Sequence, residues 1–225
     1  MAELFAIINS FDWSPRYNVA PTQSVAAVRA DCDGTGRAGT VREGKVRELV
    51  LLKWGLIPSW AKDPNIGSSL INARAETVAE KPAFRSAFRK QRCLIAVDGF
   101  YEWQAVAGQK TKQPYLIAVK DVPAFAFAGL CEHWTSPEGL PVDSCTIITT
   151  TANSFMQPIH HRMPVIVAPA DYDAWLDPAR QDPRDVLPLL KQFPADRMQA
   201  VRVSTLVNSP RNESPQCVVS MDRRT

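Results

Sequence analysis

Short apolar runs recur along the chain, and most are bounded by glycine, proline or aspartate. They have the length of strands and carry β-branched or aromatic residues, a combination that is typical of β-strands. In one run, Phe125 and Phe127 alternate with Ala126 and Ala128, which suits a sheet covered on both faces. The runs that we expect to form strands are 49–53, 94–98, 115–119, 124–130, 145–151 and 164–168.

Helical periodicity is limited to a few short segments. Phe84, Ala87 and Phe88 fall at i, i+3 and i+4, which places them on one face of a helix. Further helices are expected over 171–176 and 185–192, because each segment begins with an acidic residue. The pattern predicts an α+β fold with a mostly antiparallel β core and a few peripheral helices.

The chain has 225 residues, enough to bury a full hydrophobic core, and single β-rich domains commonly reach this length. It contains no internal repeat. The segments 31–44, 107–112 and 177–184 are polar and contain Gly or Pro, so we expect them to be connections at the surface. A single domain over residues 1–225 is the expected organisation.

The formal net charge of +3 is mildly basic and does not by itself indicate nucleic acid. Glu3 stands where a signal peptide has a basic flank, and no apolar run approaches the length of a membrane span. We therefore expect a soluble cytoplasmic protein without a membrane partner, and a monomer.

None of the five cysteines belongs to a CxxC pair, which favours free thiols over a disulfide framework. Cys131, Glu132 and His133 would form half of a metal site, but no second half is visible. Buried, inert thiols are favoured, and we expect no metal and no other cofactor. The cysteines are Cys32, Cys93, Cys131, Cys145 and Cys217.

Several clusters carry polar side chains that packing does not require. In one, alternation with a period of two places Asn72, Arg74 and Glu76 on one side of an extended segment. Taken singly, the tryptophans read as packing residues, the arginines as salt-bridge partners and the histidines as structural residues. Together, their positions beside predicted strands indicate one polar pocket. The clusters are 16–22, 54–60, 71–76, 98–103 and 159–164.

Glu102 stands between Tyr101 and Trp103, directly after a predicted strand. Packing by these aromatics would raise the pKa of the carboxyl group, because desolvation disfavours its charged form. A carboxyl group of raised pKa carries a proton at neutral pH, as a general acid must.

The clusters together resemble the SRAP family, the SOS-response-associated "peptidases" that attach covalently to abasic sites in single-stranded DNA. The resemblance extends from Arg16 to the C-terminus, with the strings in family order. They are RYNVAPTQ (16–23), WGLIPSWAKD (54–63), INARAETV (71–78), RCLIAVDGFYEW (92–103), KQPYLI (112–117), FAFAGL (125–130), TIITTTAN (146–153), IHHRMPVIV (159–167) and VNSPRN (207–212).

The resemblance implies a barrel-like β core and a covalent chemistry. In the family, the α-amine of an N-terminal Cys attacks the ring-opened sugar aldehyde, a Schiff base forms, and the thiol closes a thiazolidine. An α-amine has a lower pKa than lysine, so more of it is unprotonated near neutral pH. The implied partner is single-stranded DNA with abasic sites, so the cytoplasmic protein would join the nucleoid when bound to DNA.

The resemblance also assigns roles to individual residues. Asn72 would orient the terminal residue and the sugar, Glu102 would manage protons at the amine and imine, and His160 would assist opening of the sugar ring. The implied DNA-binding residues, which hold phosphates or stack on a base, are Arg16, Trp60, Arg74 and Arg162.

The sequence departs from the family at its start, because position 2 is Ala and the family string Met-Cys-Gly-Arg is absent. The letters AELF at positions 2–5 resemble the family's first helix, so the resemblance implies that the Cys-bearing strand would come before the first residue given. Three explanations of the absent N-terminal Cys stay open. The natural protein starts further upstream, or it is a variant that binds abasic or single-stranded DNA without a thiazolidine, or another thiol such as Cys32 or Cys93 takes the place of the terminal one. Ala2 itself would form only a reversible Schiff base.

Other function classes remain open at this point. The family's older name indicates a cysteine-type peptidase, although no GxSxG or HExxH motif is present. A β-rich module that binds single-stranded DNA without catalysis also fits the sequence as written.

Overall fold

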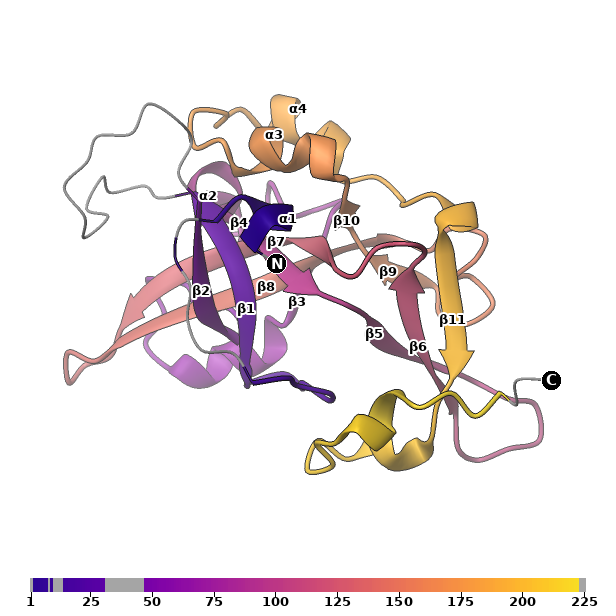
Figure 1. Cartoon of the computed structure of the whole chain (residues 1–225). Helices are drawn as coiled ribbons and strands as arrows, with labels where there is room; N and C mark the ends of the chain where they lie inside the picture. Colours follow the sequence, from indigo (N-terminus) through magenta and orange to yellow (C-terminus); the bar gives the residue numbers. More distant parts are fainter. Residues whose placement is uncertain (1, 8, 10–13, 31–46, 223–225) are drawn as a thin grey trace.

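The computed structural model describes residues 2–7, 9, 14–30 and 47–222 (Figure 1). The predicted connection 31–44 and Cys32 therefore lie outside the described residues. The strands are β1 (Ser24–Ala30), β2 (Arg47–Trp54), β3 (Asn72–Arg74), β4 (Arg92–Val97), β5 (Phe100–Gln104), β6 (Gln113–Val119), β7 (Phe125–Thr135), β8 (Pro141–Thr151), β9 (Arg162–Pro164), β10 (Ile166–Val167) and β11 (Met198–Arg202). The α-helices are α1 (Ala2–Phe5), α2 (Arg85–Lys90), α3 (Tyr172–Leu176) and α4 (Pro183–Val186). The 3-10 helices are η1 (Pro64–Ser69), η2 (Pro169–Asp171), η3 (Leu187–Leu189), η4 (Ala195–Arg197), η5 (Thr205–Asn208) and η6 (Pro215–Val218).

A closed barrel forms the centre of the fold. Its strands follow the order β7-β4-β1-β2-β8, and pairing of β7 with β8 closes the ring. Neighbouring barrel strands are antiparallel except for the parallel pair β2–β8. β3 and β9 extend the sheet beside β8, while β11, β6 and β5 form a separate sheet (Figure 1). The predicted α+β fold with a barrel-like core is confirmed.

Strand β7 has apolar side chains on both faces, as its alternating pattern predicts. Ala126 and Ala128 belong to the core cluster that includes Phe88 of α2 and Trp175 of α3. Phe127 belongs to the second cluster, which includes Ile117 of β6. The small alanines let the helices approach one face of the sheet, and the phenylalanine side chains fill the space on the other face.

The segment 185–192 differs from its prediction. Helix α4 begins at Pro183 and ends at Val186, and the chain continues as η3 to Leu189. The side chain of Asp182 accepts a hydrogen bond from the Arg184 N–H at 2.9 Å, so the N-cap lies before the predicted start. The alternating acids and prolines in this region did not reveal which acid caps the helix.

The structure departs from the predicted strands at two further places. The segment 98–103 was expected to follow a strand, but most of it belongs to the strand β5 itself. The run 164–168 is divided, because β9 pairs with β8 whereas β10 pairs with β7. The runs predicted at 49–53, 94–98, 115–119 and 145–151 correspond to β2, β4, β6 and β8.

Candidate functional site

Strand β3 presents the first pair of candidate residues. It pairs in parallel with β8, with Asn72 opposite Ile147 and Arg74 opposite Thr149. Both Asn72 and Arg74 are exposed, while Ala73 between them is buried. The alternation that the sequence predicts is therefore present, and it turns the amide and the guanidinium group outward from the barrel.

Glu102 and His160 lie close together. The Nδ1 atom of His160 lies 3.7 Å from Oε1 of Glu102, and their side chains are 34% and 22% exposed. Nδ1 of His160 also lies 3.0 Å from the carbonyl oxygen of Arg162 and 3.3 Å from its backbone nitrogen, so it donates to the carbonyl in one tautomer and accepts the N–H in the other.

The pKa of Glu102 is raised, because burial disfavours the carboxylate more than nearby His160, Lys112 and the backbone of Trp103 favour it. The raised pKa agrees with the sequence prediction, but packing by the neighbouring aromatic residues does not explain it. Tyr101 and Trp103 alternate with Glu102 along β5, so their side chains leave from the opposite face of the strand.

Gln104 connects β5 to the segment that carries His160, a role that the sequence did not reveal. Its Nε2 donates to the carbonyl oxygen of Pro158 at 2.9 Å. The hydroxyl group of Tyr115, on the neighbouring strand β6, donates to Oε1 of Gln104 at 3.1 Å. Alternation places Gln104 on the same face of β5 as Glu102, which is the one signal that could have pointed to it.

The Arg162 guanidinium group joins β9 to the end of β3. It forms a bidentate ion pair with Glu76, at 2.8 and 3.0 Å, and NH2 also donates to the Thr149 carbonyl oxygen at 2.7 Å. The pKa of Glu76 is lowered chiefly by the hydrogen bond from Arg162. The Nε atom of Arg162 is buried and has no hydrogen-bond partner within the described part of the chain.

Arg74, like the other arginines, reads singly as a salt-bridge partner, but the nearby carboxylate of Glu76 pairs with Arg162 instead. Among the residues that the structure describes, the Arg74 side chain has no ion pair. Its charge still helps to lower the pKa of Glu76, but the exposed guanidinium group makes no ion pair with a carboxylate and is available to a phosphate group. The DNA-binding roles of Arg74 and Arg162 stay predictions.

Trp60 protrudes from a well-fixed turn. Its side chain is 60% exposed, whereas Trp54 is partly buried and donates its indole N–H to the Ile71 carbonyl oxygen at 2.8 Å. The buried carboxylate of Glu132 accepts the Ser59 N–H at 2.8 Å beside Trp60. The turn thus holds a large aromatic ring in solvent, as base stacking requires.

The possible half-site at 131–133 has structural roles instead. Cys131 is buried, Glu132 holds the turn before Trp60, and Nδ1 of exposed His133 lies 2.6 Å from Asp143. Within the described ranges, no group of three or more His, Cys, Asp or Glu side chains is placed to hold a metal ion. The cysteines at 93, 131, 145 and 217 are free and buried, as predicted.

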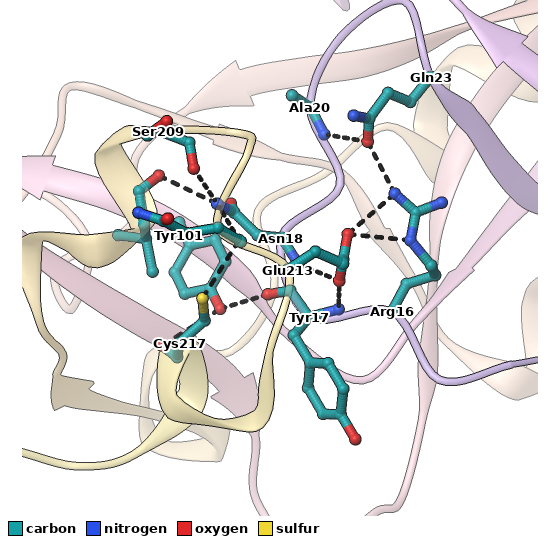
Figure 2. A network of polar contacts seen from close by, with 11 residues as sticks. Arg16, Tyr17, Asn18, Ala20, Gln23, Tyr101, Ser209, Glu213 and Cys217 are labelled. Carbon is teal, nitrogen blue, oxygen red and sulfur yellow. Dashed lines mark hydrogen bonds and ion pairs between the residues drawn. The ribbon is translucent and has the colours of Figure 1, made fainter.

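Arg16 lies in a separate polar network (Figure 2). Its Nε and NH2 contact Oε2 of Glu213, each at 2.9 Å, and NH2 donates to Gln23 at 2.9 Å. Glu213 also accepts the backbone N–H groups of Tyr17 and Asn18. The guanidinium group therefore joins the loop that follows it to the C-terminal part of the chain, and its contact with DNA stays a prediction.

Comparison with known proteins identifies the class. The chain belongs to the SOS response associated peptidase (SRAP) family, whose model matches residues 2–210.

Relatives within the family carry a more specific name. The abasic site processing protein YoqW of Bacillus subtilis is 46% identical over 209 residues, which cover 93% of this chain and 88% of the relative. The abasic site processing protein HMCES of Gallus gallus is 33% identical over 240 residues, covering 93% of this chain and 67% of the relative.

Solved structures share the fold. A protein from Bacteroides thetaiotaomicron has a TM-score of 0.72 and 31% identity, covering 91% of this chain and 80% of its own. A protein from Bordetella bronchiseptica has a TM-score of 0.74 and 26% identity, covering 91% and 94%. Across the described residues, no helix combines the length and apolar character needed to span a bilayer.

Proposed function

We propose that this protein recognises abasic sites in single-stranded DNA and becomes covalently linked to them. The observation that carries the proposal is the proximity of Glu102 and His160, a carboxyl group and an imidazole 3.7 Å apart in a partly exposed site. The family membership and the names of the relatives support the same substrate.

The proposed chemistry needs a proton donor and acceptor at the sugar. The ring-opened sugar carries an aldehyde, which an N-terminal α-amine attacks to give a carbinolamine and then, with loss of water, an imine. Glu102 donates a proton to the departing hydroxyl group, since its raised pKa leaves more of it protonated than an ordinary carboxyl group. His160 assists opening of the sugar ring, and Asn72 orients the sugar.

The final step depends on a thiol beside that amine. Addition of the thiol across the C=N bond gives a thiazolidine and traps a linkage that is otherwise reversible. The Met-Cys-Gly-Arg string that supplies this thiol in the family is absent from the sequence. The two halves of the chemistry are therefore tested separately, imine formation with the present chain and ring closure with a version that carries the string.

DNA binding would rest on charge and stacking around this site. Arg74 is available for a phosphate group, and Arg162 would exchange Glu76 for one. Trp60 would stack on a base, and Arg16 would make a weaker phosphate contact. Binding through such contacts weakens as salt rises, because condensed counterions are released from the DNA.

The test is an adduct assay on single-stranded DNA with one abasic site. The present chain is incubated with sodium borohydride, which reduces an imine to a stable amine, and the version with Met-Cys-Gly-Arg is incubated without it. A band that survives denaturing electrophoresis is expected, and Asn72→Ala or Glu102→Gln should weaken it at least about tenfold. Gln216→Ala, at an exposed position on η6, is the control. Absence of an adduct from both versions would reject the covalent function.

A peptidase is the second candidate, since the family description names that activity. Cleavage of a peptide by the present chain, lost in Glu102→Gln, would support it. Salt-sensitive binding to DNA without any adduct would instead support a non-covalent module.

A further inference from the structure

Strand β5, which carries Glu102, lies at the edge of its sheet. The order in that sheet is β11-β6-β5, so, among the residues that the structure describes, backbone hydrogen bonds to another strand hold β5 on one side only. An edge strand is less constrained than a central one. The distance from Glu102 to His160 therefore depends on what the side chains of β5 contact.

The back face of β5 is held by residues from both ends of the sequence. The indole N–H of Trp103 donates to Oδ1 of Asn208 at 2.7 Å. The hydroxyl group of Tyr101 donates to the carbonyl oxygen of Tyr17 at 2.6 Å and lies 3.4 Å from that of Cys217 (Figure 2). These contacts leave from the face opposite Glu102, so they fix the strand without occupying the site.

The residues that hold this face are themselves anchored. We name residues 204–217 the C-terminal clasp. Asn18, which is 5% exposed, donates from Nδ2 to clasp carbonyl oxygens of Val207, Ser209 and Asn212 at 3.3, 3.0 and 3.1 Å. Glu213 of the clasp closes the network by accepting from Arg16 and from two backbone N–H groups.

We propose that Asn208 is a positioning residue for Glu102, acting through Trp103: the clasp holds β5 at the place where Glu102 meets His160. The proposal rests on the proposed function only in naming Glu102 as the reacting carboxyl group. Asn208 does not reach the reacting atoms, because it lies behind the strand. On the front face, the hydrogen bond from Gln104 to Pro158 completes the hold on β5.

Release of the clasp has a predictable effect on Glu102. Burial is the largest influence on its pKa, and the groups that oppose it are His160, Lys112 and the backbone of Trp103. A β5 that moves more freely admits water to the carboxyl group, which relieves the larger effect. The pKa of Glu102 should therefore fall in a variant that breaks the contact with Asn208.

The test measures the pKa of Glu102 by NMR of isotope-labelled glutamate in the full chain, with Glu102→Gln used to assign the signal. Asn208→Ala and Trp103→Phe should each lower the pKa by about half a unit or more. The double variant should show no further decrease, because both changes remove the same hydrogen bond. Gln216→Ala, on an exposed part of the clasp, should leave the pKa unchanged.

An unchanged pKa in folded Asn208→Ala and Trp103→Phe would overturn the proposal, and so would a double variant whose decrease equals the sum of the single ones. If Asn208→Ala does not fold, Tyr101→Phe tests the same face and should lower the pKa in the same direction. The failure of the proposed function is seen elsewhere, as normal adduct formation by Glu102→Gln. The two results are independent.

Discussion

Replacement of Asn18 by alanine should strongly destabilise the fold. The Asn18 amide group is buried and donates to three clasp carbonyl oxygens, of which those of Ser209 and Asn212 are nearest, at 3.0 and 3.1 Å. Alanine removes about two hydrogen bonds, each worth roughly 0.5–1.5 kcal/mol net. The Ser209 carbonyl keeps its bond from the Asn212 N–H, and the Asn212 carbonyl keeps its contact with Cys217 Sγ. We expect a loss of about 1–3 kcal/mol in the free energy of unfolding.

Urea unfolding followed by fluorescence measures this loss, and thermal unfolding should show a decrease in Tm of about 2–12 °C for a chain of this length. The matched control is Asn212→Ala, which removes one exposed amide–carbonyl bond, to Leu206, and should cost about 1 kcal/mol or less. A loss below about 1 kcal/mol for Asn18→Ala, or one equal to that of the control, would refute the reasoning.

Further predictions concern pH and close packing. The pKa of Glu213 is lowered in the folded protein, since hydrogen bonds from Tyr17, Arg16 and Asn18 together outweigh the effect of burial. The stability that the Glu213 carboxylate contributes is therefore fully present above the unfolded-state pKa of about 4.3. It is lost as the pH falls through the folded-state pKa. Unfolding measured from neutral to acidic pH should show a smaller loss for Glu213→Gln than for the unchanged chain; an equal loss would contradict this. Gly55 has a φ of +129°, and a Cβ there would lie 2.7 Å from the Gly67 carbonyl oxygen. Gly55→Ala should therefore lower the free energy of unfolding, measured in urea, by more than about 1 kcal/mol. An unchanged free energy of unfolding would contradict the prediction that a side chain strains the backbone at this position.

The sequence predicts local features of this fold well. The alternation at 125–128 predicts a strand buried on both faces, and the structure places those side chains in two core clusters. The alternation from Asn72 to Glu76 predicts their common exposure. In both cases the prediction concerns which face of one strand a side chain occupies, and the alternation along the strand determines this.

Long-range partners were beyond the sequence. Arg162 pairs with Glu76 across 86 positions, and Arg16 with Glu213 across 197. The sequence around Arg162 and Arg16 does not indicate which carboxylate each arginine will contact. From the sequence alone, Arg74 is therefore as reasonable a partner of Glu76 as Arg162 is. Strand β5 was missed for a related reason: its residues are all half-buried, so it lacks the apolar alternation that marks a strand.

The most direct test of the proposed function compares single strands that differ only in the aldehyde. One carries an abasic site, and the other carries a tetrahydrofuran analogue that cannot open to an aldehyde. With the borohydride-treated chain, and with the version that carries Met-Cys-Gly-Arg, we predict a denaturation-resistant adduct on the abasic strand only. Equal bands on both strands, or none on either, would contradict covalent action at the sugar aldehyde.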